Sequence, residues 1–228
     1  MANLPEPQAQ LFAPAPLPRE ELIATCVTLL RGFAAPTAAL VAAIEAIAAQ
    51  APFRCLQTPG GGTMSVAMSN CGAWGWHSDR RGYRYVAQDP LSAQAWPAMP
   101  AAFLGLAQAA ALRGGFPGFE PDCCLVNRYV VGAQMGAHRD FDELDMRHPI
   151  VSVSIGLPAR FSWHGATRRE PARKLALHDG DVLVWGGEAR AGYHAVSRLA
   201  APVGDAPGVP RDPELGPLRY NLTFRRAR

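Results

Sequence analysis

The stretch RYNLTFR, residues 219–225, alternates strictly between polar and apolar side chains. Successive side chains of a strand point to opposite faces, so Tyr220, Leu222 and Phe224 share one face and the polar side chains share the other. The pattern predicts a β-strand with one buried face. In an ordinary half-buried strand the polar face would point to solvent, and this interpretation stays open for the strand alone. The polar face comprises Arg219, Asn221, Thr223 and Arg225.

Short runs rich in β-branched and aromatic residues recur upstream of this strand, between Gly, Pro and Asp turns. Apolar residues at helical spacing predict amphipathic helices at about residues 20–33 and 37–50, and a further helix at about 98–113. Many short strands with few helices predict a mainly β (α+β) fold, with the N-terminal helices packed outside a sandwich or barrel. The further predicted strands are residues 64–68, 83–86, 124–131, 150–157, 160–163, 174–177 and 182–185.

The composition is that of a globular protein, because 49% of the 228 residues are hydrophobic and 18% are charged. The length fits one domain of ordinary size, with or without an N-terminal extension. Residues 1–18 are rich in proline and have little periodic apolar content, so we expect a flexible tail there. The net charge of +3 is too small to identify a nucleic-acid-binding protein by itself.

Cysteine usage and the apolar stretches suggest a cytoplasmic protein. The five cysteines include no C-x-x-C pair, so no disulfide framework or zinc ribbon is predicted. The N-terminus lacks the basic start and the continuous apolar core of a signal peptide. Residues 34–53 are the most apolar stretch, but Pro36, Glu45 and Gln50 interrupt it, so we expect no membrane span.

Candidate metal ligands lie in NRYVVGAQMGAHRDFDE, residues 127–143, where His138 and Asp140 are two residues apart. If this segment is extended, both side chains leave the same face, and His194 can approach from another strand. Two imidazoles and one carboxylate leave the other side of an Fe(II) ion open for a cosubstrate and O2. However, an H-x-D pair also occurs by chance, and an open catalytic zinc site uses similar ligands. These three residues alone leave the metal undecided.

A second group of polar residues would suit a small dianion. Asn127 and Tyr129 are also two residues apart, and with the polar face of residues 219–225 they offer amide, phenol and guanidinium groups. Arginine binds a carboxylate in a bidentate manner, while Asn and Tyr supply neutral donors that fix its orientation. 2-Oxoglutarate fits this set, since it can chelate iron at one end while an arginine holds the other.

At these residues the sequence resembles the AlkB family of Fe(II)- and 2-oxoglutarate-dependent dioxygenases. The resemblance extends from about residue 52 to residue 225 through the blocks PFR, TPGGGTMSVAMSNCG, WPAMP, NRY, HRDFDE, PIVSVSIGLPA, GDVLVWGGE, YH and RYNLTFR. It implies a double-stranded β-helix, or jelly roll, in one compact domain. In that domain residues 19–115 would hold the N-terminal helices and a substrate-covering segment, and residues 116–228 would form the dioxygenase core.

The resemblance also implies a reaction and a set of site residues. The reaction is oxidative demethylation of N-alkylated bases such as 1-methyladenine and 3-methylcytosine in DNA, preferably in single strands, with release of formaldehyde, succinate and CO2. His138, Asp140 and His194 would be the catalytic iron ligands. The residues implied for 2-oxoglutarate are Arg219, Asn221 and Tyr129 at its distal carboxylate, and Arg225 and Asn127 near its iron-proximal end.

Substrate contacts are implied at a base pocket, because the family must flip a base out of a duplex or act on single strands. Trp76 and Tyr83 match positions that line this pocket and contact the flanking phosphate, with His138 as the opposing wall. Asp142 matches a position that reads the exocyclic amine of adenine or cytosine. Trp76 and Tyr83 as plain core or surface aromatics, and Asp142 as a turn aspartate, remain the alternatives. Further matching positions are Arg168 at the pocket edge, with a one-residue ambiguity toward Arg169, and Thr58 and Met68.

Gly62 departs from the family pattern, because the bacterial family member carries a tyrosine there that helps to grip nucleic acid. We expect weaker strand binding from the loss of that ring. Two alternatives to DNA repair stay open. One is the same chemistry on RNA, tRNA, protein or a small molecule, and the other is a non-catalytic nucleic-acid-binding jelly roll. We expect a monomer in either case.

Overall fold

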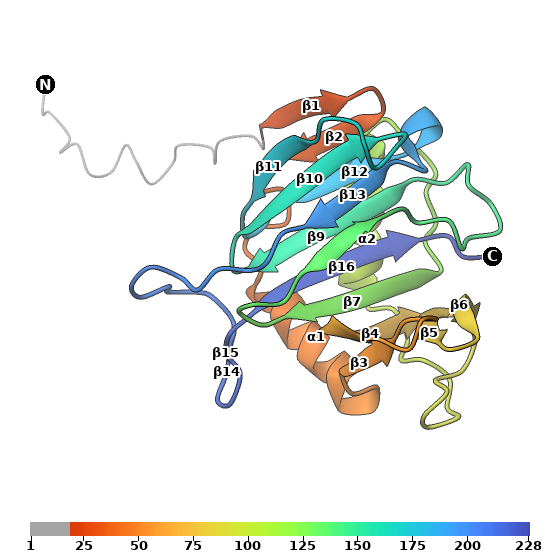
Figure 1. The fold of residues 1–228 in the computed structure, drawn as a ribbon, viewed down its shortest axis with the longest axis vertical. Helices are drawn as coiled ribbons and strands as arrows, with labels where there is room; N and C mark the ends of the chain where they lie inside the picture. The colour runs from red at the N-terminus through yellow and green to blue at the C-terminus, as the bar shows by residue number, and fades with distance from the viewer. Residues whose placement is uncertain (1–18) are drawn as a thin grey trace, which may run out of the picture.

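The computed structural model describes residues 19–228, which form two facing antiparallel sheets with helices behind the larger one (Figure 1). The predicted tail, residues 1–18, lies outside the described residues. The larger sheet has the strand order β1 (Glu20–Ala24), β2 (Val27–Leu30), β12 (Val182–Trp185), β9 (Ile150–Gly156), β16 (Arg219–Arg225), β7 (Cys123–Tyr129), β4 (Thr63–Gly72) and β3 (Arg54–Gln57).

The smaller sheet covers the other face of the larger one. Its strand order is β11 (Arg173–Leu177), β10 (Ala159–Gly165), β13 (Tyr193–Val196) and β8 (Met135–His138). This double-layered arrangement confirms the predicted mainly β jelly roll. The remaining elements are the hairpin β5 (Gly75–Asp79) and β6 (Gly82–Val86), the short pair β14 (Arg211–Asp212) and β15 (Gly216–Pro217), the 3-10 turn Gly187–Ala189, and the helices α1 (Ala38–Gln50) and α2 (Ala101–Arg113).

The central strand β16 has the predicted alternation. Its apolar residues, among them Leu222 and Phe224, pack with Ile44 of α1 and Phe103 of α2 in the core behind the larger sheet. Its polar residues face the space between the two sheets instead of solvent, because β7 and β9 flank β16 and the smaller sheet covers it. Arg219 is only 1% exposed as a result. The solvent-facing interpretation of this strand is therefore wrong.

The helix predicted at residues 20–33 is wrong, because this segment forms the hairpin β1–β2. The turn is made at Cys26, whose φ is +59°. Leu30 packs into the core behind the larger sheet and Leu29 into the core between the sheets, so neighbouring residues bury opposite faces. Pairing of β2 with β12, with Leu30 opposite Val182, gives the segment its backbone partners. Tertiary pairing thus overrides an apolar spacing that also suits a helix.

The other two predicted helices are confirmed, and both pack behind the larger sheet. α1 buries Leu40, Ile44 and Ile47 against it. α2 begins at Ala101, slightly later than predicted, because Pro100 has an extended conformation and directly precedes the first helical residue.

Strand pairing joins the N-terminal and C-terminal parts of the chain into one sheet. β2 pairs with β12, and β4 pairs with β7 so that Met68 lies opposite Asn127. The β5–β6 hairpin projects from this region. Gly75 opens it in close contact with the Trp96 indole, where a Cβ atom would lie 2.2 Å from the ring.

Within residues 19–228, no helix has the length and apolar character needed to cross a membrane.

Candidate metal and cosubstrate site

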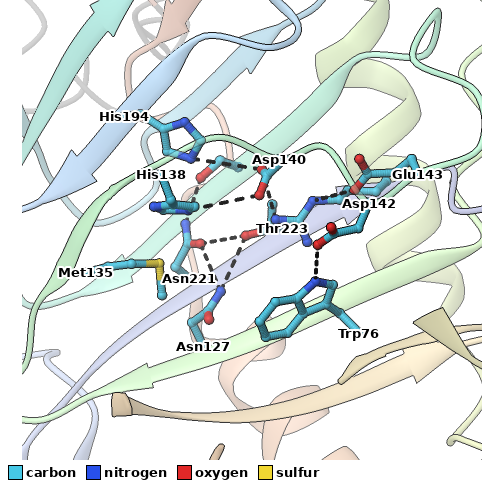
Figure 2. Close-up of polar contacts among 12 residues, drawn as sticks. Trp76, Asn127, Met135, His138, Asp140, Asp142, Glu143, His194, Asn221 and Thr223 are labelled. Atoms are coloured by element: carbon cyan, nitrogen blue, oxygen red, sulfur yellow. Dashed lines mark hydrogen bonds and ion pairs between the residues drawn. The ribbon is translucent and has the colours of Figure 1, made fainter. Parts of the chain in front are cut away.

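His138, Asp140 and His194 converge between the two sheets (Figure 2), and their ligand atoms all lie within 4.8 Å of one another. His138 ends β8, and Asp140 follows just beyond that strand. His194 lies on β13, directly opposite His138 in the pairing of these two strands. β8 and β13 are short strands that the sequence pattern missed, so the cross-strand pairing of the two histidines is a result of the tertiary structure.

Backbone carbonyls fix the orientation of both imidazoles. His138 Nδ1 lies 2.9 Å from the Gly136 carbonyl oxygen, and His194 Nδ1 lies 3.1 Å from that of Gly192. A carbonyl only accepts hydrogen bonds, so each Nδ1 carries the proton and each Nε2 keeps a free lone pair. The Nε2 atoms lie 4.0 Å and 3.9 Å from the Asp140 carboxylate oxygens. Such orientation by a second hydrogen bond is typical of metal-binding histidines.

Asp140 is buried and lies next to a cation. Its Oδ2 atom forms an ion pair with Arg225 Nη2 at 2.9 Å, but accepts no well-aligned hydrogen bond from residues 19–228. Burial disfavours the charged form of Asp140, yet Arg225, His194 and His138 outweigh burial and hold its pKa below the usual range. Burial, reinforced by His138, lowers the pKa of His194 to about 4. At neutral pH the cluster therefore offers one carboxylate and a neutral buried imidazole, which suits a divalent cation.

Arg219 lies deeper between the sheets and has no carboxylate partner among residues 19–228. Its Nη1 donates to the Leu157 carbonyl oxygen at 3.0 Å and its Nη2 to Ser154 Oγ at 2.9 Å, while Nε has no partner in the described structure. Burial lowers the pKa of Arg219 to about 10. A buried guanidinium without a counter-ion is costly, so this position favours binding of an anion.

Amide and hydroxyl groups along β16 connect Arg219 with the group of candidate metal ligands, His138, Asp140 and His194. Asn221 donates to Ser152 Oγ at 2.8 Å, and Thr223 donates to Asn221 Oδ1 at 2.8 Å. Asn127 on β7 contacts both residues (Figure 2), and its own Oδ1 has no partner within residues 19–228. Among residues 19–228, the Met135 thioether, at 3.8 Å, is the one acceptor near the neighbouring Tyr129 hydroxyl. Sulfur is a weak acceptor, so this hydroxyl can turn to a better one.

The aromatic residues predicted for the base pocket lie on the β5–β6 hairpin. Trp76 and Tyr83 stack with ring centroids 5.4 Å apart and an interplanar angle of 20°. Trp76 Nε1 donates to Asp142 Oδ2 at 2.8 Å (Figure 2). The hairpin is thereby connected to the loop that carries Asp140, and neither Trp76 nor Asp142 is an isolated surface residue.

All residues predicted for the metal, cosubstrate and substrate line one cavity of about 590 Å³. Met68 is buried in the wall formed by β4. Thr58 closes a turn with Gly62, and a Cβ atom at Gly62 would meet only Thr58 Oγ1, at 3.3 Å. Arg168 lines the cavity, as the resemblance implies, whereas the nearby Arg173 donates to the Ile23 carbonyl oxygen.

Glu143 was missed by the sequence analysis. Its side chain is buried and accepts a hydrogen bond from the Tyr85 hydroxyl at 2.5 Å, while Arg190 lies at 2.9 Å and Arg225 Nε at 3.4 Å. Arg190 also donates to the Asp140 carbonyl oxygen. Glutamate in an acidic loop is usually exposed, so no sequence pattern indicates this role. The network holds Arg225 and the Asp140 loop together.

A jelly roll with an open two-histidine, one-carboxylate cluster and a buried unpaired arginine defines a class, the Fe(II)- and 2-oxoglutarate-dependent oxygenases. In agreement, residues 26–225 match the model of the 2OG-Fe(II) oxygenase superfamily. The free Nε2 lone pairs of the two histidines and the Asp140 carboxylate fit Fe(II), and the unpaired Nε donor of Arg219 in the described structure fits a carboxylate of 2-oxoglutarate.

Comparison with known proteins narrows the class. The chain is 49% identical to alpha-ketoglutarate-dependent dioxygenase AlkB of Escherichia coli, over 95% of this chain and 97% of that protein. It is 33% identical to mouse nucleic acid dioxygenase ALKBH1, over 52% of this chain and 31% of that protein. The solved structure of OsALKBH1 superposes with a TM-score of 0.78 at 26% identity, covering 91% of this chain and 100% of that one. The chain therefore belongs to the AlkB family and is an Fe(II)- and 2-oxoglutarate-dependent dioxygenase.

Proposed function

We propose that this dioxygenase removes alkyl groups from N-alkylated bases in DNA, such as 1-methyladenine and 3-methylcytosine, preferably in single strands. The observation that carries the proposal is the Trp76–Tyr83 stack beside Asp142 in the same cavity as the metal cluster. Stacked aromatic rings suit the faces of a nucleobase, and a carboxylate suits its exocyclic amine. The name of the mouse relative, nucleic acid dioxygenase, supports the same substrate class.

The proposed iron ligands are His138 Nε2, His194 Nε2 and the Asp140 carboxylate. Both Nε2 lone pairs are free because the Nδ1 protons face carbonyl oxygens. Arg225 keeps Asp140 ionised, so this ligand need not lose a proton when a metal ion binds at neutral pH. When bound, the Fe(II) centre supplies oxidation of the N-methyl carbon by O2, coupled to conversion of 2-oxoglutarate to succinate and CO2, and the hydroxylated carbon leaves as formaldehyde.

The proposed residues for the distal carboxylate of 2-oxoglutarate are Arg219, Asn221 and Tyr129. Arg219 has no carboxylate partner among residues 19–228, and the Tyr129 hydroxyl has only a weak sulfur acceptor. Burial raises the pKa of Tyr129 to about 12, so its hydroxyl stays protonated and can donate. We assign Asn127 and Arg225 to the iron-proximal end, since both have polar atoms without partners in the described structure.

The proposed substrate residues surround the mouth of the cavity. Trp76 and Tyr83 would stack with the flipped base, and Asp142 would accept from its amine. His138 would form the opposite wall. Residues that lie at the edge and in the wall of the same cavity are Arg168, Thr58 and Met68.

A product assay tests the proposal. With a methylated single-stranded oligonucleotide, the Fe(II)-loaded enzyme should release formaldehyde from the base and succinate from 2-oxoglutarate in equal amounts. An RNA oligonucleotide and a methylated peptide serve as competing substrates. Succinate formation without base repair on any DNA oligonucleotide would contradict the proposal and favour another substrate.

We further propose that the enzyme is a cytoplasmic monomer. The five cysteines are free thiols in the structure, which supports a reducing compartment. Size-exclusion chromatography with light scattering tests the monomer, and a mass near twice the 24.4 kDa of the chain would contradict it.

A further inference from the structure

Phe141 is a large exposed side chain in the loop between β8 and β9, which carries Asp140 and is called the metal loop below. Its two neighbours turn into the protein, since Asp140 pairs with Arg225 and Asp142 accepts from Trp76. Phe141 points the other way and is 57% exposed. It belongs to none of the four buried-core clusters of the described residues, so core packing gives no reason for an aromatic ring here.

Arg139 packs against this ring and against Tyr193, and Arg168 packs against Tyr193 in turn. The Arg139 guanidinium carbon lies 4.6 Å from the Phe141 ring centroid and 5.5 Å from that of Tyr193. The Arg168 guanidinium carbon lies 5.2 Å from the Tyr193 centroid. These distances are within the range of cation–π contacts. We call the four side chains, Phe141, Arg139, Tyr193 and Arg168, the arginine–aromatic platform.

The platform carries an excess of positive charge. Within residues 19–228, aromatic rings are the partners that the structure gives to Arg139 and Arg168, and neither guanidinium is paired with a carboxylate. Ordinary exposed arginines are solvated, whereas these two pack against aromatic rings beside the cavity. The result is a local positive charge next to a flat exposed ring, which is complementary to a phosphate joined to a base.

The platform is continuous with the cavity of the site. Arg139, Arg168 and Tyr193 line this cavity together with Trp76, whereas Phe141 lies outside its lining. A nucleotide whose base enters the cavity keeps its neighbours attached through the backbone. The neighbouring nucleotide must therefore lie at the rim, where Phe141 presents its ring.

We propose that the platform binds the nucleotide next to the base in the cavity, with Phe141 stacking on the unpaired neighbouring base and Arg139 and Arg168 contacting the flanking phosphates. The occupant is a single nucleic-acid strand. The inference rests on the proposed function, and it adds a second stacking site on the side of the metal loop. It also provides contacts to the nucleic-acid strand in a protein that has Gly62 in place of the tyrosine of the bacterial family member.

Binding to the metal-free protein tests the platform without turnover. Fluorescence anisotropy would measure the affinity of a single-stranded oligonucleotide that carries one 1-methyladenine. Phe141→Ala should weaken binding by about 5- to 100-fold, the range for loss of one base–aromatic stack. Phe141→Tyr should restore it. The matched control is Leu144→Ala, because Leu144 is an exposed apolar residue of the same loop, at 75%, without an arginine partner among residues 19–228.

A stacking signal gives a second readout. 2-Aminopurine placed next to the methylated base should lose fluorescence on binding to the unaltered protein and to Leu144→Ala, but not to Phe141→Ala. Arg139→Gln should reduce the slope of log binding constant against log salt concentration by about one, since one phosphate contact is lost. This variant tests the platform even if Phe141→Ala folds poorly.

The two proposals fail in different ways. If the unaltered enzyme repairs methylated oligonucleotides but Phe141→Ala and Leu144→Ala bind equally well and 2-aminopurine stays bright, the platform is overturned and the proposed function stands. If the unaltered protein neither binds nor oxidises methylated oligonucleotides, the proposed function is overturned, and the platform with it.

Discussion

Arg225 Nη2 lies 2.9 Å from Asp140 Oδ2, with only 6% of the Arg225 side chain and 11% of the Asp140 side chain exposed. This pair connects the central strand β16 with the loop after β8. Because the same guanidinium also reaches Glu143 at 3.4 Å, one residue of the C-terminal strand orients two carboxylates of the metal loop. The position of the proposed iron ligand therefore depends on residues far away in sequence.

Asp140→Ala should abolish turnover. The change removes the anionic ligand and takes one carboxylate away from Arg225. Anaerobic titration of the unaltered protein with Fe(II) and 2-oxoglutarate should give a weak visible charge-transfer band, which the variant should lack. Asp145→Ala is the control, since Asp145 pairs with Arg147 on the same loop and lies outside the cavity lining. Turnover by Asp140→Ala would show that the ligand assignment is wrong.

Arg219→Lys should weaken 2-oxoglutarate binding by about 10- to 100-fold, as expected for loss of a charge-assisted hydrogen bond worth about 1.5–3 kcal/mol. Lysine keeps the charge but lacks the planar fork that Leu157 and Ser154 hold in place. Calorimetric titration of the Fe(II)-free protein measures the change without catalysis. Arg226→Lys, just beyond the end of the same strand and outside the cavity lining, should bind as the unaltered protein does. Equal affinities for Arg219→Lys and the control would exclude Arg219 from the distal carboxylate.

Glu143→Gln should destabilise the protein by about 3–5 kcal/mol, because it removes the negative partner of two buried arginines. Urea unfolding followed by circular dichroism measures the loss. Tyr85→Phe removes a single hydrogen bond to the same carboxylate and should cost about 1 kcal/mol. If Glu143→Gln lowers the free energy of unfolding by no more than Tyr85→Phe does, the Glu143 ion pairs contribute little to stability.

Trp76→Ala should raise KM for a methylated oligonucleotide by about tenfold, with a smaller effect on kcat, because a stacking surface worth about 1–3 kcal/mol is lost. Trp76→Phe keeps a ring and loses only the Nε1 hydrogen bond to Asp142, so its KM should rise less. Steady-state formaldehyde release gives both constants. Similar KM values for the unaltered enzyme and both variants would place the base elsewhere.

The hairpin that carries Trp76 should loosen in acid. Hydrogen bonds from Arg84, and from the Arg81 backbone, hold the pKa of Asp79 below its usual range. A lowered pKa in the folded state means that this stabilisation is present above the unfolded pKa of about 4 and is lost as the pH falls below it.

Asp79→Asn should therefore increase hydrogen exchange of the amides of residues 75–86 at pH 7, with a difference from the unaltered protein that shrinks progressively below about pH 4. Asp205→Asn, on an exposed segment, should not change exchange in the hairpin. A difference for Asp79→Asn that is the same at pH 7 and at low pH would contradict the assignment of the effect to the Asp79 charge.

Much of the site could be predicted from periodicity and spacing. The alternation of residues 219–225 identified the strand and the set of side chains on its polar face, because side-chain direction in a strand follows a period of two. The spacing of His138 and Asp140 likewise indicated a candidate ligand pair, while the family resemblance suggested its role. The hairpin β1–β2 was mistaken for a helix, since its apolar residues serve both faces of a sheet and this depends on pairing with β12.

The sequence by itself determined the residue types of the site and the family to which the chain belongs, because motifs and periods are local. Only the tertiary structure decided that the polar face of β16 points inward, that His194 lies opposite His138, and that Glu143 is buried against Arg190. These relationships arise when two sheets close over one another and exclude water, which converts exposed polar side chains into buried partners. Such long-range burial has no signature in the local sequence.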